Sequence, residues 1–221
     1  EIDAIVEMML RASFYFDQPL TLDEIFAWHR ALFPTGFSGL YKIQAGRLRD
    51  DRTGAMQVVS GGYGRTKVHF EAPAAQLLPE ELAKFIAWYN EEQSDLDLTL
   101  KAGIAHLWFV TLHPFEDGNG RLTRAITERM LAKSDGSGRR FYSMSAQILT
   151  TRSEYYTILE STQKGLTSIT DWLVWFLQTL DQALTTALTR TQRTVDKAQF
   201  WHRHRNTTFN ERQVIMINRL W

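Results

Sequence analysis

The sequence predicts an all-α protein that carries one small β-hairpin. Apolar residues recur with helical spacing in most segments between residues 2 and 190. One stretch, residues 56–70, instead has two β-prone runs on either side of a glycine cluster, which is the pattern of a hairpin. Proline and glycine separate the periodic segments. A chain of 221 residues can bury a sizeable core, so we expect one main domain with an appendage.

Charge balance and cysteine content narrow the classes of function. The chain has 25 Lys and Arg residues against 25 Asp and Glu residues, so no overall field favours nucleic acid or a membrane. The absence of cysteine excludes disulfides, thiolate zinc sites and a cysteine nucleophile. It also fits a reducing compartment, and we expect a cytoplasmic protein. No signal peptide or long uncharged apolar run is present, so we expect no membrane partner.

Two helices and a loop are predicted before the hairpin. The first helix covers residues 2–16, and the second covers residues 21–33, where Thr21 and Glu24 have the spacing of a capping box. Residues 37–51 lack a helical period and are predicted to be a loop. The apolar face expected on the first helix consists of Ile2, Ile5, Val6, Met9 and Leu10.

The hairpin arm that follows the glycine cluster has a simple alternation. Because successive strand side chains point to opposite faces, we expect Lys67 and His69 on one face and Val68 and Phe70 on the other. Two more helices are then predicted, over residues 80–92 and 98–111.

His106 lies on the second of these helices, seven residues before His113 and on roughly the same face. It is either a hydrogen-bonded core histidine, which is the more common situation, or a residue that supports His113.

Residues 112–124 are the stretch around which the chain is organised. Pro114 moves His113 out of the helical region, so the preceding helix must stop there. Gly118 and Gly120 permit tight turns and close approach of a ligand to the backbone. A new helical period then begins at Leu122, Ala125, Ile126 and Met130. The start of a helix carries unpaired N–H groups and positive dipole charge, which makes it an anion site.

The side chains of this stretch suit chemistry at phosphorus. Arg121 and Arg124 lie close together on the first turn of the new helix. Asp117 offers oxygen ligands for Mg²⁺ shared with a phosphate. His113 can be neutral near pH 7 and take up a proton. A base, a metal ligand, an anion cradle and counter-charges together predict phosphoryl or nucleotidyl transfer.

The rest of the chain is predicted to be helical. A helix over residues 146–164 would carry Tyr156 and Gln163 two turns apart on one face. A further helix begins near residue 170, and its segment 172–177 is apolar all round, which indicates a buried core helix. Residues 190–205 are locally basic and predict a solvated linker helix, with contact to nucleic acid as the alternative.

Residues 113–124 resemble the motif of the Fic family, His-Pro-Phe-x-Asp/Glu-Gly-Asn-Gly-Arg-x-x-Arg. The resemblance implies an all-α Fic fold, a helical bundle whose small β-hairpin, the flap, lies over the catalytic loop. It also implies a protein adenylyltransferase, an enzyme that moves AMP from ATP to a Ser, Thr or Tyr hydroxyl of a protein, itself included, and releases pyrophosphate.

The resemblance gives each residue of the stretch a role. His113 takes the proton of the target hydroxyl, and Asp117 holds the Mg²⁺ that accompanies ATP. The phosphates are bound by the backbone and side chain of Asn119, by the backbone of Gly118 and Gly120, and by Arg121 and Arg124. An adenine pocket with Tyr156 and Gln163 and a target-docking flap with Thr66, Lys67, Val68 and His69 are also implied.

The expected domain organisation follows from the same resemblance. Residues 1–190 form the Fic core, with the flap at about 56–72 and the catalytic loop at 113–121. Residues 191–221 form a linker helix and the start of a winged-helix domain, which many longer Fic proteins carry. The chain begins with Glu1 rather than Met and ends inside an apolar pattern, so we expect a fragment of a longer, bacterial protein.

Other functions remain open at this stage. The same fold also serves removal of AMP or transfer of another phosphate-containing group. A non-enzymatic alternative is a DNA-binding regulator that contacts nucleic acid through its C-terminal region. Many Fic proteins are inhibited by a glutamate helix, and no good match to its motif occurs in this sequence. We therefore expect an inhibitory helix upstream or on a partner chain, and the resemblance leaves a homodimer open.

Overall fold

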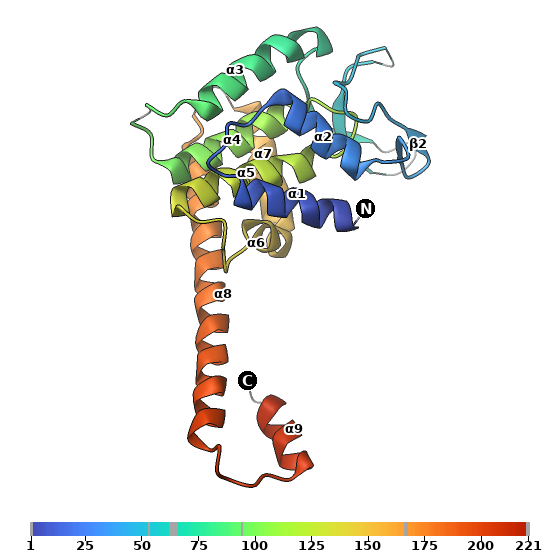
Figure 1. The fold of residues 1–221 in the computed structure, drawn as a ribbon. Coiled ribbons are helices and arrows are strands. Elements are labelled where there is room, and N and C mark those ends of the chain that lie inside the picture. The colour runs from blue at the N-terminus through green and yellow to red at the C-terminus, as the bar shows by residue number, and fades with distance from the viewer. Residues whose placement is uncertain (1, 53, 62–65, 94, 166–167, 220–221) are drawn as a thin grey trace.

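The structure is a computed structural model that describes residues 2–52, 54–61, 66–93, 95–165 and 168–219. The helices are α1 (Ile2–Phe14), α2 (Leu22–Leu32), α3 (Leu78–Asn90), α4 (Leu98–Leu112), α5 (Asn119–Asp135), α6 (Met144–Thr150), α7 (Arg152–Lys164), α8 (Thr170–Arg203) and α9 (Glu211–Arg219). A 3₁₀ turn, Ala75–Leu77, precedes α3. Figure 1 shows a body of packed helices from which α8 projects as a stalk, with α9 beside its far end.

The strands form two separate antiparallel hairpins. One pairs β1 (Phe37–Ser38) with β2 (Tyr41–Lys42), and the other pairs β3 (Gln57–Ser60) with β4 (Lys67–Glu71). The second hairpin is the predicted flap, and its predicted glycine turn at residues 62–65 lies outside the described residues. The all-α fold with a small flap is therefore confirmed. The prediction that residues 37–51 form a loop is partly wrong, because the short first hairpin lies within this segment.

The flap contains a β-bulge that the sequence pattern did not predict. Val58 pairs with Phe70 and Val59 pairs with Val68, so His69 is an extra residue in β4. A bulge breaks the alternation of side chains. The expected arrangement is consequently confirmed only in part. Lys67 and His69 share a side, since both approach Glu160, but Val68 is exposed whereas Phe70 is partly buried.

Helices α4 and α5 form the centre of the body. Their contact is the most extensive between any two described elements, and it includes the fully buried Phe109, Leu122 and Ile126. Gly103 of α4 allows α8 to approach closely, because a Cβ at this position would lie 3.0 Å from the Phe176 ring. The other helices cover this pair, and the loop between α4 and α5 reaches the side of the body near the flap.

The apolar face of α1 differs from the expected face. Met8 and Ala12 are buried, with Ile5 and Met9 partly buried beside them. Val6 and Leu10 were expected inside but are 51% and 52% exposed, respectively. The side chain of Ile2 lies outside the described residues. The true stripe still has helical spacing, but the abundance of apolar residues on α1 made its direction ambiguous.

The helix predicted over residues 146–164 is two helices. Thr151 leaves the helical region with φ −111° and ψ 33°, so α6 ends at Thr150 and α7 begins at Arg152. The hydroxyls of Thr150 and Thr151 both donate to the carbonyl oxygen of Gln147. Such side-chain bonds compete with the helical pattern and explain the break.

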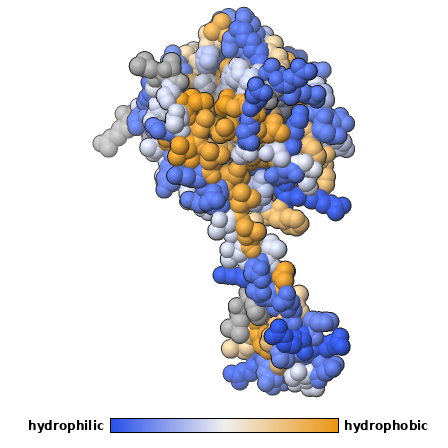
Figure 2. Space-filling view, turned by 90° about the vertical axis from the view of Figure 1, so that its left-hand side faces the viewer, coloured by the Kyte–Doolittle hydropathy of each residue, from blue (hydrophilic) through white to orange (hydrophobic). Residues whose placement is uncertain are grey.

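Helix α8 crosses the predicted domain boundary at residue 190 without interruption. Its first turns are less buried than expected: Trp172 and Phe176 are fully buried, whereas Val174 and Leu177 are 48% and 39% exposed. Figure 2 shows apolar residues gathered on one side of the body and at the top of the stalk. In the described part of the chain, no helix is both long and apolar enough to cross a bilayer.

The capping signal predicted at Thr21 is confirmed, and α9 begins with a capping box that was not predicted. Thr21 accepts a hydrogen bond from the Glu24 N–H at 3.2 Å and starts α2. Asn210 and Gln213 form a reciprocal box at the start of α9, in which each side chain accepts from the backbone N–H of the other at 2.9 Å.

His106 is the hydrogen-bonded core histidine that the sequence favoured. The Thr127 hydroxyl donates to the Thr123 carbonyl, so the imidazole Nδ1–H must donate to Thr127 Oγ1, 3.0 Å away. Nε2 then accepts from the Tyr155 hydroxyl at 3.1 Å. Both ring nitrogens are used by the neutral form, and burial lowers the pKa of His106 to about 3.

This burial predicts a loss of stability in acid. At a pH below the ordinary histidine pKa of 6.5, His106 binds a proton in the unfolded chain but stays neutral in the folded protein. The free energy of unfolding should therefore fall by up to about 1.4 kcal/mol per pH unit from this residue alone. Urea unfolding at pH 6.5, 5.5 and 4.5 should show a shallower decline for His106→Gln than for the native protein. Equal declines would contradict the prediction.

Candidate active site

The loop between α4 and α5 places a histidine at a helix end. His113 is the C-cap of α4, with φ 47° and ψ 56°, and its N–H donates to the Phe109 carbonyl at 3.2 Å. Within the described residues it alone has a positive φ without being glycine. This left-handed conformation costs on the order of 1–2 kcal/mol, so the surroundings must hold it. Pro114 ends the helix as predicted, one residue later than expected.

The His113 imidazole presents one nitrogen as a base. Nδ1 lies 3.2 Å from the carbonyl oxygen of Val110, which can only accept, so we assign the proton to Nδ1. Nε2 then carries the lone pair. Burial lowers the pKa of His113, helped by Arg49, while the bond to Val110 and the charge of Asp117 oppose this effect. The side chain is therefore neutral near pH 7.

The start of α5 is the predicted anion site. Gly118 is its N-cap, with φ 81°, and a Cβ there would also lie 2.8 Å from the Phe33 ring, so glycine is required. The N–H of Arg121 bonds to the Gly118 carbonyl. Across the described chain, the N–H groups of Asn119 and Gly120 have no hydrogen-bond partner, and they are available to an anion.

The Asn119 side chain has a different role from the expected one. Its Oδ1 accepts from the Phe115 N–H at 3.0 Å, and its Nδ2 donates to the Phe115 carbonyl at 2.7 Å. The residue is 2% exposed. Both ends of the amide are thus used to fold the loop, and a phosphate could bind Asn119 only through its backbone.

Asp117 lies at the mouth of the site with its side chain 46% exposed. Its carboxylate accepts hydrogen bonds from the Gly118 N–H and the Ser38 hydroxyl, and it lies 3.7 Å from a guanidinium nitrogen of Arg121. No cluster of three or more ligating side chains occurs in the described residues. A single exposed carboxylate beside an anion site fits Mg²⁺, which prefers one or two protein carboxylates together with phosphate oxygens and waters.

Two arginines face the start of α5. The Arg121 guanidinium lies 4.7 Å from the centre of the Phe33 ring, which holds it in place. The Arg124 guanidinium lies against Gly120, and burial lowers its pKa. Within the part of the chain that the structure describes, Arg124 has no carboxylate at ion-pair distance. A partly buried cation without a counter-ion favours an anionic ligand.

His29 of α2 supports the loop, although no local pattern predicted this role. The Gly46 N–H donates to Nδ1 at 2.7 Å, so Nε2 carries the proton and donates to the Asp117 carbonyl at 3.1 Å. The ring also stacks on Phe115 at 4.1 Å between centroids. His29 is fully buried, and burial lowers its pKa.

Arg49 is the second support that sequence reasoning missed. Its side chain is fully buried, and Nε donates to the His113 carbonyl at 2.7 Å while Nη2 reaches the Leu112 carbonyl at 3.5 Å. It also donates to the Pro73 carbonyl and pairs with Asp51 at 2.8 Å. A cation at the end of α4 satisfies carbonyls that have no partner in the helix.

The side chain of Glu116 also helps to hold the loop. Its carboxylate accepts from the Gln44 N–H at 2.7 Å. Ser38, Gln44, Gly46 and Arg49 all come from residues 37–51, which thus brace the catalytic loop from one side.

The two residues expected at the adenine do not line one cavity. Gln163 donates to the Thr111 hydroxyl at 3.0 Å and lines a cleft of about 350 Å³ between α4 and α7. Tyr156 is 50% exposed and packs against Tyr155, outside that lining. Only Gln163 therefore lies in a cavity large enough for part of a nucleoside.

The four flap residues expected to contact a target differ in their surroundings. Thr66 and Val68 are exposed, whereas Lys67 and His69 both approach Glu160 of α7. Strand β4 therefore faces α7. Within the described chain, the outer edge of β3 has no strand partner.

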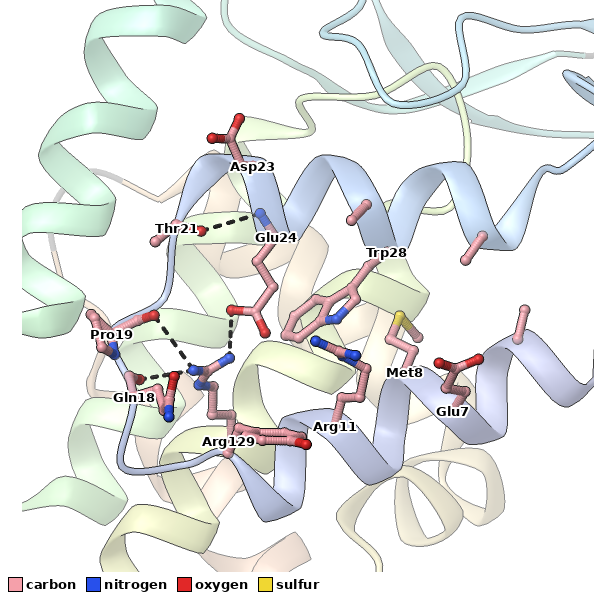
Figure 3. A pocket seen from close by; sticks show the side chains of 14 residues that line it. Glu7, Met8, Arg11, Gln18, Pro19, Thr21, Asp23, Glu24, Trp28 and Arg129 are labelled. Atoms are coloured by element: carbon pink, nitrogen blue, oxygen red, sulfur yellow. Dashed lines mark hydrogen bonds and ion pairs between the residues drawn. The ribbon is translucent and has the colours of Figure 1, made fainter.

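A cavity of about 680 Å³ lies between α1 and α2 and contains no predicted site residue (Figure 3). Arg129 of α5 lines it, and its guanidinium donates to Glu24 at 2.7 Å and to the Gln18 carbonyl at 2.8 Å. These bonds tie α5 to the start of α2, and they have a structural role.

Comparison with known proteins agrees with this geometry. A family model described as Fic/DOC family matches residues 19–131. The protein adenylyltransferase fic-1 of Caenorhabditis briggsae is 28% identical over 147 residues, which is 66% of this chain and 25% of that protein. A uridine 5′-monophosphate transferase of Xanthomonas campestris pv. campestris is 32% identical over 123 residues, 52% of this chain and 21% of that protein. The chain thus spans about a quarter of the length of these curated relatives.

Solved structures show the same fold. The crystal structure of a Fic domain containing signaling protein from Bacteroides thetaiotaomicron aligns with a TM-score of 0.61 at 22% identity. The alignment covers 84% of this chain and 66% of that one. At this identity the similarity concerns the fold, and it extends beyond the catalytic loop to most of the helical body.

The bracing role of Arg49 predicts a large loss of stability on its removal. Arg49→Met would leave the carbonyls of Leu112, His113 and Pro73 and the Asp51 carboxylate without their buried partner. The free energy of unfolding should fall by about 3–5 kcal/mol. Arg52→Met is the matched control, because the Arg52 side chain is 82% exposed, and it should change stability by less than about 0.5 kcal/mol. Urea unfolding measures both, and similar values for the two variants would contradict the role.

Proposed function

This chain belongs to the Fic/DOC family, and we propose that it is a protein adenylyltransferase, which transfers AMP from ATP to a hydroxyl group of a protein. The observation that carries the proposal is the juxtaposition of a neutral histidine base with an anion site only five residues away along the chain. Among the described residues, His113 Nε2 and the first N–H groups of α5 have no hydrogen-bond partner, and Arg121 and Arg124 lie on the first turns of this helix.

The chain's own residues divide the reaction between them. The N–H groups of Asn119 and Gly120 and the side chains of Arg121 and Arg124 bind the phosphates of ATP. His113 Nε2 removes the proton of the target hydroxyl as its oxygen attacks the α-phosphorus. The bond between the α-phosphorus and the bridging oxygen breaks, and pyrophosphate leaves with both electrons. Positioning and fixed charge supply most of the rate enhancement.

Asp117 is proposed to hold Mg²⁺ bound with the nucleotide. Its carboxylate is exposed at the mouth of the site and adjoins both Gly118 and Arg121. When bound, the ion would neutralise phosphate charge and orient the phosphates. The Ser38 hydroxyl, which donates to this carboxylate, keeps it turned toward the loop.

The target segment is proposed to bind as an added strand on β3. The sequence favoured β4, but its Lys67 and His69 are directed at α7. The edge of β3, Gln57–Ser60, is unpaired among the described residues and can bond to an extended peptide through its main chain. Gln163, in the cleft beside Thr111, is the residue we assign to the base of the nucleotide.

A second candidate is transfer of UMP. One relative is named a uridine 5′-monophosphate transferase and is 32% identical over 123 residues. The catalytic loop itself binds phosphates and does not distinguish the base, so the choice of nucleotide depends on the cleft near Gln163.

The proposed activity predicts which label the protein transfers. The protein is incubated with cell lysate, Mg²⁺ and ATP labelled at either the α- or the γ-phosphate. Label should enter protein from the α-position only, and His113→Ala should reduce the rate by about 10²–10⁴-fold. His202→Ala, on the exposed stalk, is the control and should transfer AMP normally.

The alternatives give different outcomes in the same experiment. Transfer from the γ-position would mean transfer of phosphate. Transfer from α-labelled UTP in preference to ATP would support the second candidate. Absence of transfer from all three would overturn both.

The burial of His113 predicts the pH dependence of the transfer. The base is active only when neutral, and its pKa is lowered from the ordinary value of 6.5. The acid limb of kcat/KM should therefore have its midpoint below 6.5, and the rate should rise above that midpoint to a plateau that extends to pH 8. Initial rates between pH 4.5 and 8 measure this, and a midpoint above 6.5 would contradict the assignment.

A further inference from the structure

The shortest side-chain contact between the flap and α7 is made by a histidine. His69 is the extra residue of the β-bulge in β4, and a bulge redirects the side chain it carries. Its Nδ1 lies 2.6 Å from Glu160 Oε2, in the middle of α7. Its Nε2 bonds to the Ser60 hydroxyl on β3. One imidazole thus connects both strands of the flap to the helical body.

The chemistry of these groups determines which atom donates each hydrogen bond. An ionised carboxylate only accepts, so Nδ1 carries a proton and donates to Glu160. In the neutral ring Nε2 then accepts from the Ser60 hydroxyl. Lys164, one turn further along α7, lies 2.6 Å from Oε1 of Glu160, and Lys67 of β4 lies 3.6 Å from it. Glu160 therefore binds two groups of β4 and one group of its own helix.

The position of Glu160 on α7 relates the flap to the catalytic loop. Gln163 is three residues further along and bonds to Thr111 of α4, only two residues before His113. Tyr156 is four residues earlier and contributes to the electrostatic environment of Arg124. The same face of α7 thus contacts the end of α4, the flap and the surroundings of an anion-binding arginine.

We propose that Glu160 is a positioning residue that holds the flap over the catalytic loop through His69, and so sets the place where the target polypeptide binds. The inference rests on the proposed function, because the position of the flap would determine where a target segment paired with β3 lies. Glu160 touches no reacting atom in this arrangement. Its effect is on the binding of the polypeptide and leaves the binding of the nucleotide unchanged.

The chain offers a matched pair of variants for the test. Glu160→Gln keeps the shape of the side chain but removes the charge that binds His69. Lys164→Met removes the other close partner of Glu160 and leaves the contact with β4 intact. A merely stabilising role of Glu160 within α7 would make the two variants behave alike.

Amide hydrogen exchange of residues 57–60 and 67–71 reports on the flap without requiring any activity. Glu160→Gln should speed this exchange by about tenfold, the effect expected from losing one charge-assisted hydrogen bond, and Lys164→Met should leave it unchanged. Exchange in α4 and α5 should not change in either variant. Equal flap exchange in the two variants would overturn the proposal.

The second measurement compares the KM for the target protein with the KM for ATP. The probe is the lysate protein that α-labelled ATP marks, isolated from that experiment. Glu160→Gln should raise the KM for this protein at least fivefold, with the KM for ATP within twofold of the native value. An unchanged KM for the protein would overturn the positioning role. If the native protein transfers no AMP at all, the proposed function fails, and the exchange measurement alone decides whether Glu160 holds the flap.

Discussion

The two hydrogen bonds between the Asn119 side chain and the Phe115 backbone are the constraint on which the site depends. They close the loop of residues 113–118 on itself and bring the end of α4 to the start of α5. The negative end of one helix dipole therefore lies beside the positive end of another. A base and an anion site can share so short a segment only because this reversal is fixed.

The reversal also needs support from outside the loop, since His113 has a strained backbone and four carbonyls there are bonded from outside it. Arg49 binds the carbonyls of Leu112 and His113, its own N–H binds that of Pro114, and His29 binds that of Asp117. Segment 37–51 and α2 thus act as a rigid frame around the loop. The loop therefore contains the candidate reactive groups, whereas residues distant in sequence hold the loop in its conformation.

Sequence reasoning located the loop well and the residues that support it poorly. The loop, the flap and most helix ends depend on local signals, such as Pro114, Gly118 and Thr21. Such signals can be recognised in the sequence without knowledge of the fold. His29 and Arg49 lie 88 and 64 residues away from the atoms they bind, and no local period marks such pairs. The bulge at His69 and the break at Thr151 were missed because both interrupt an otherwise regular pattern by one residue. The Asn119 side chain was misassigned because an asparagine amide suits backbone and phosphate equally well.

The charges of the site explain why a metal and a nucleotide would bind together. Asp117 accepts from the Gly118 N–H and lies near Arg121, which is one of the groups proposed to bind a phosphate. A bound phosphate would displace the carboxylate and leave it next to further negative charge. A divalent cation held by Asp117 would supply positive charge that offsets this repulsion, so binding of the metal and binding of the nucleotide would favour each other. Arg124 has no carboxylate to displace within the described residues, and under the proposed function its charge would attract a phosphate.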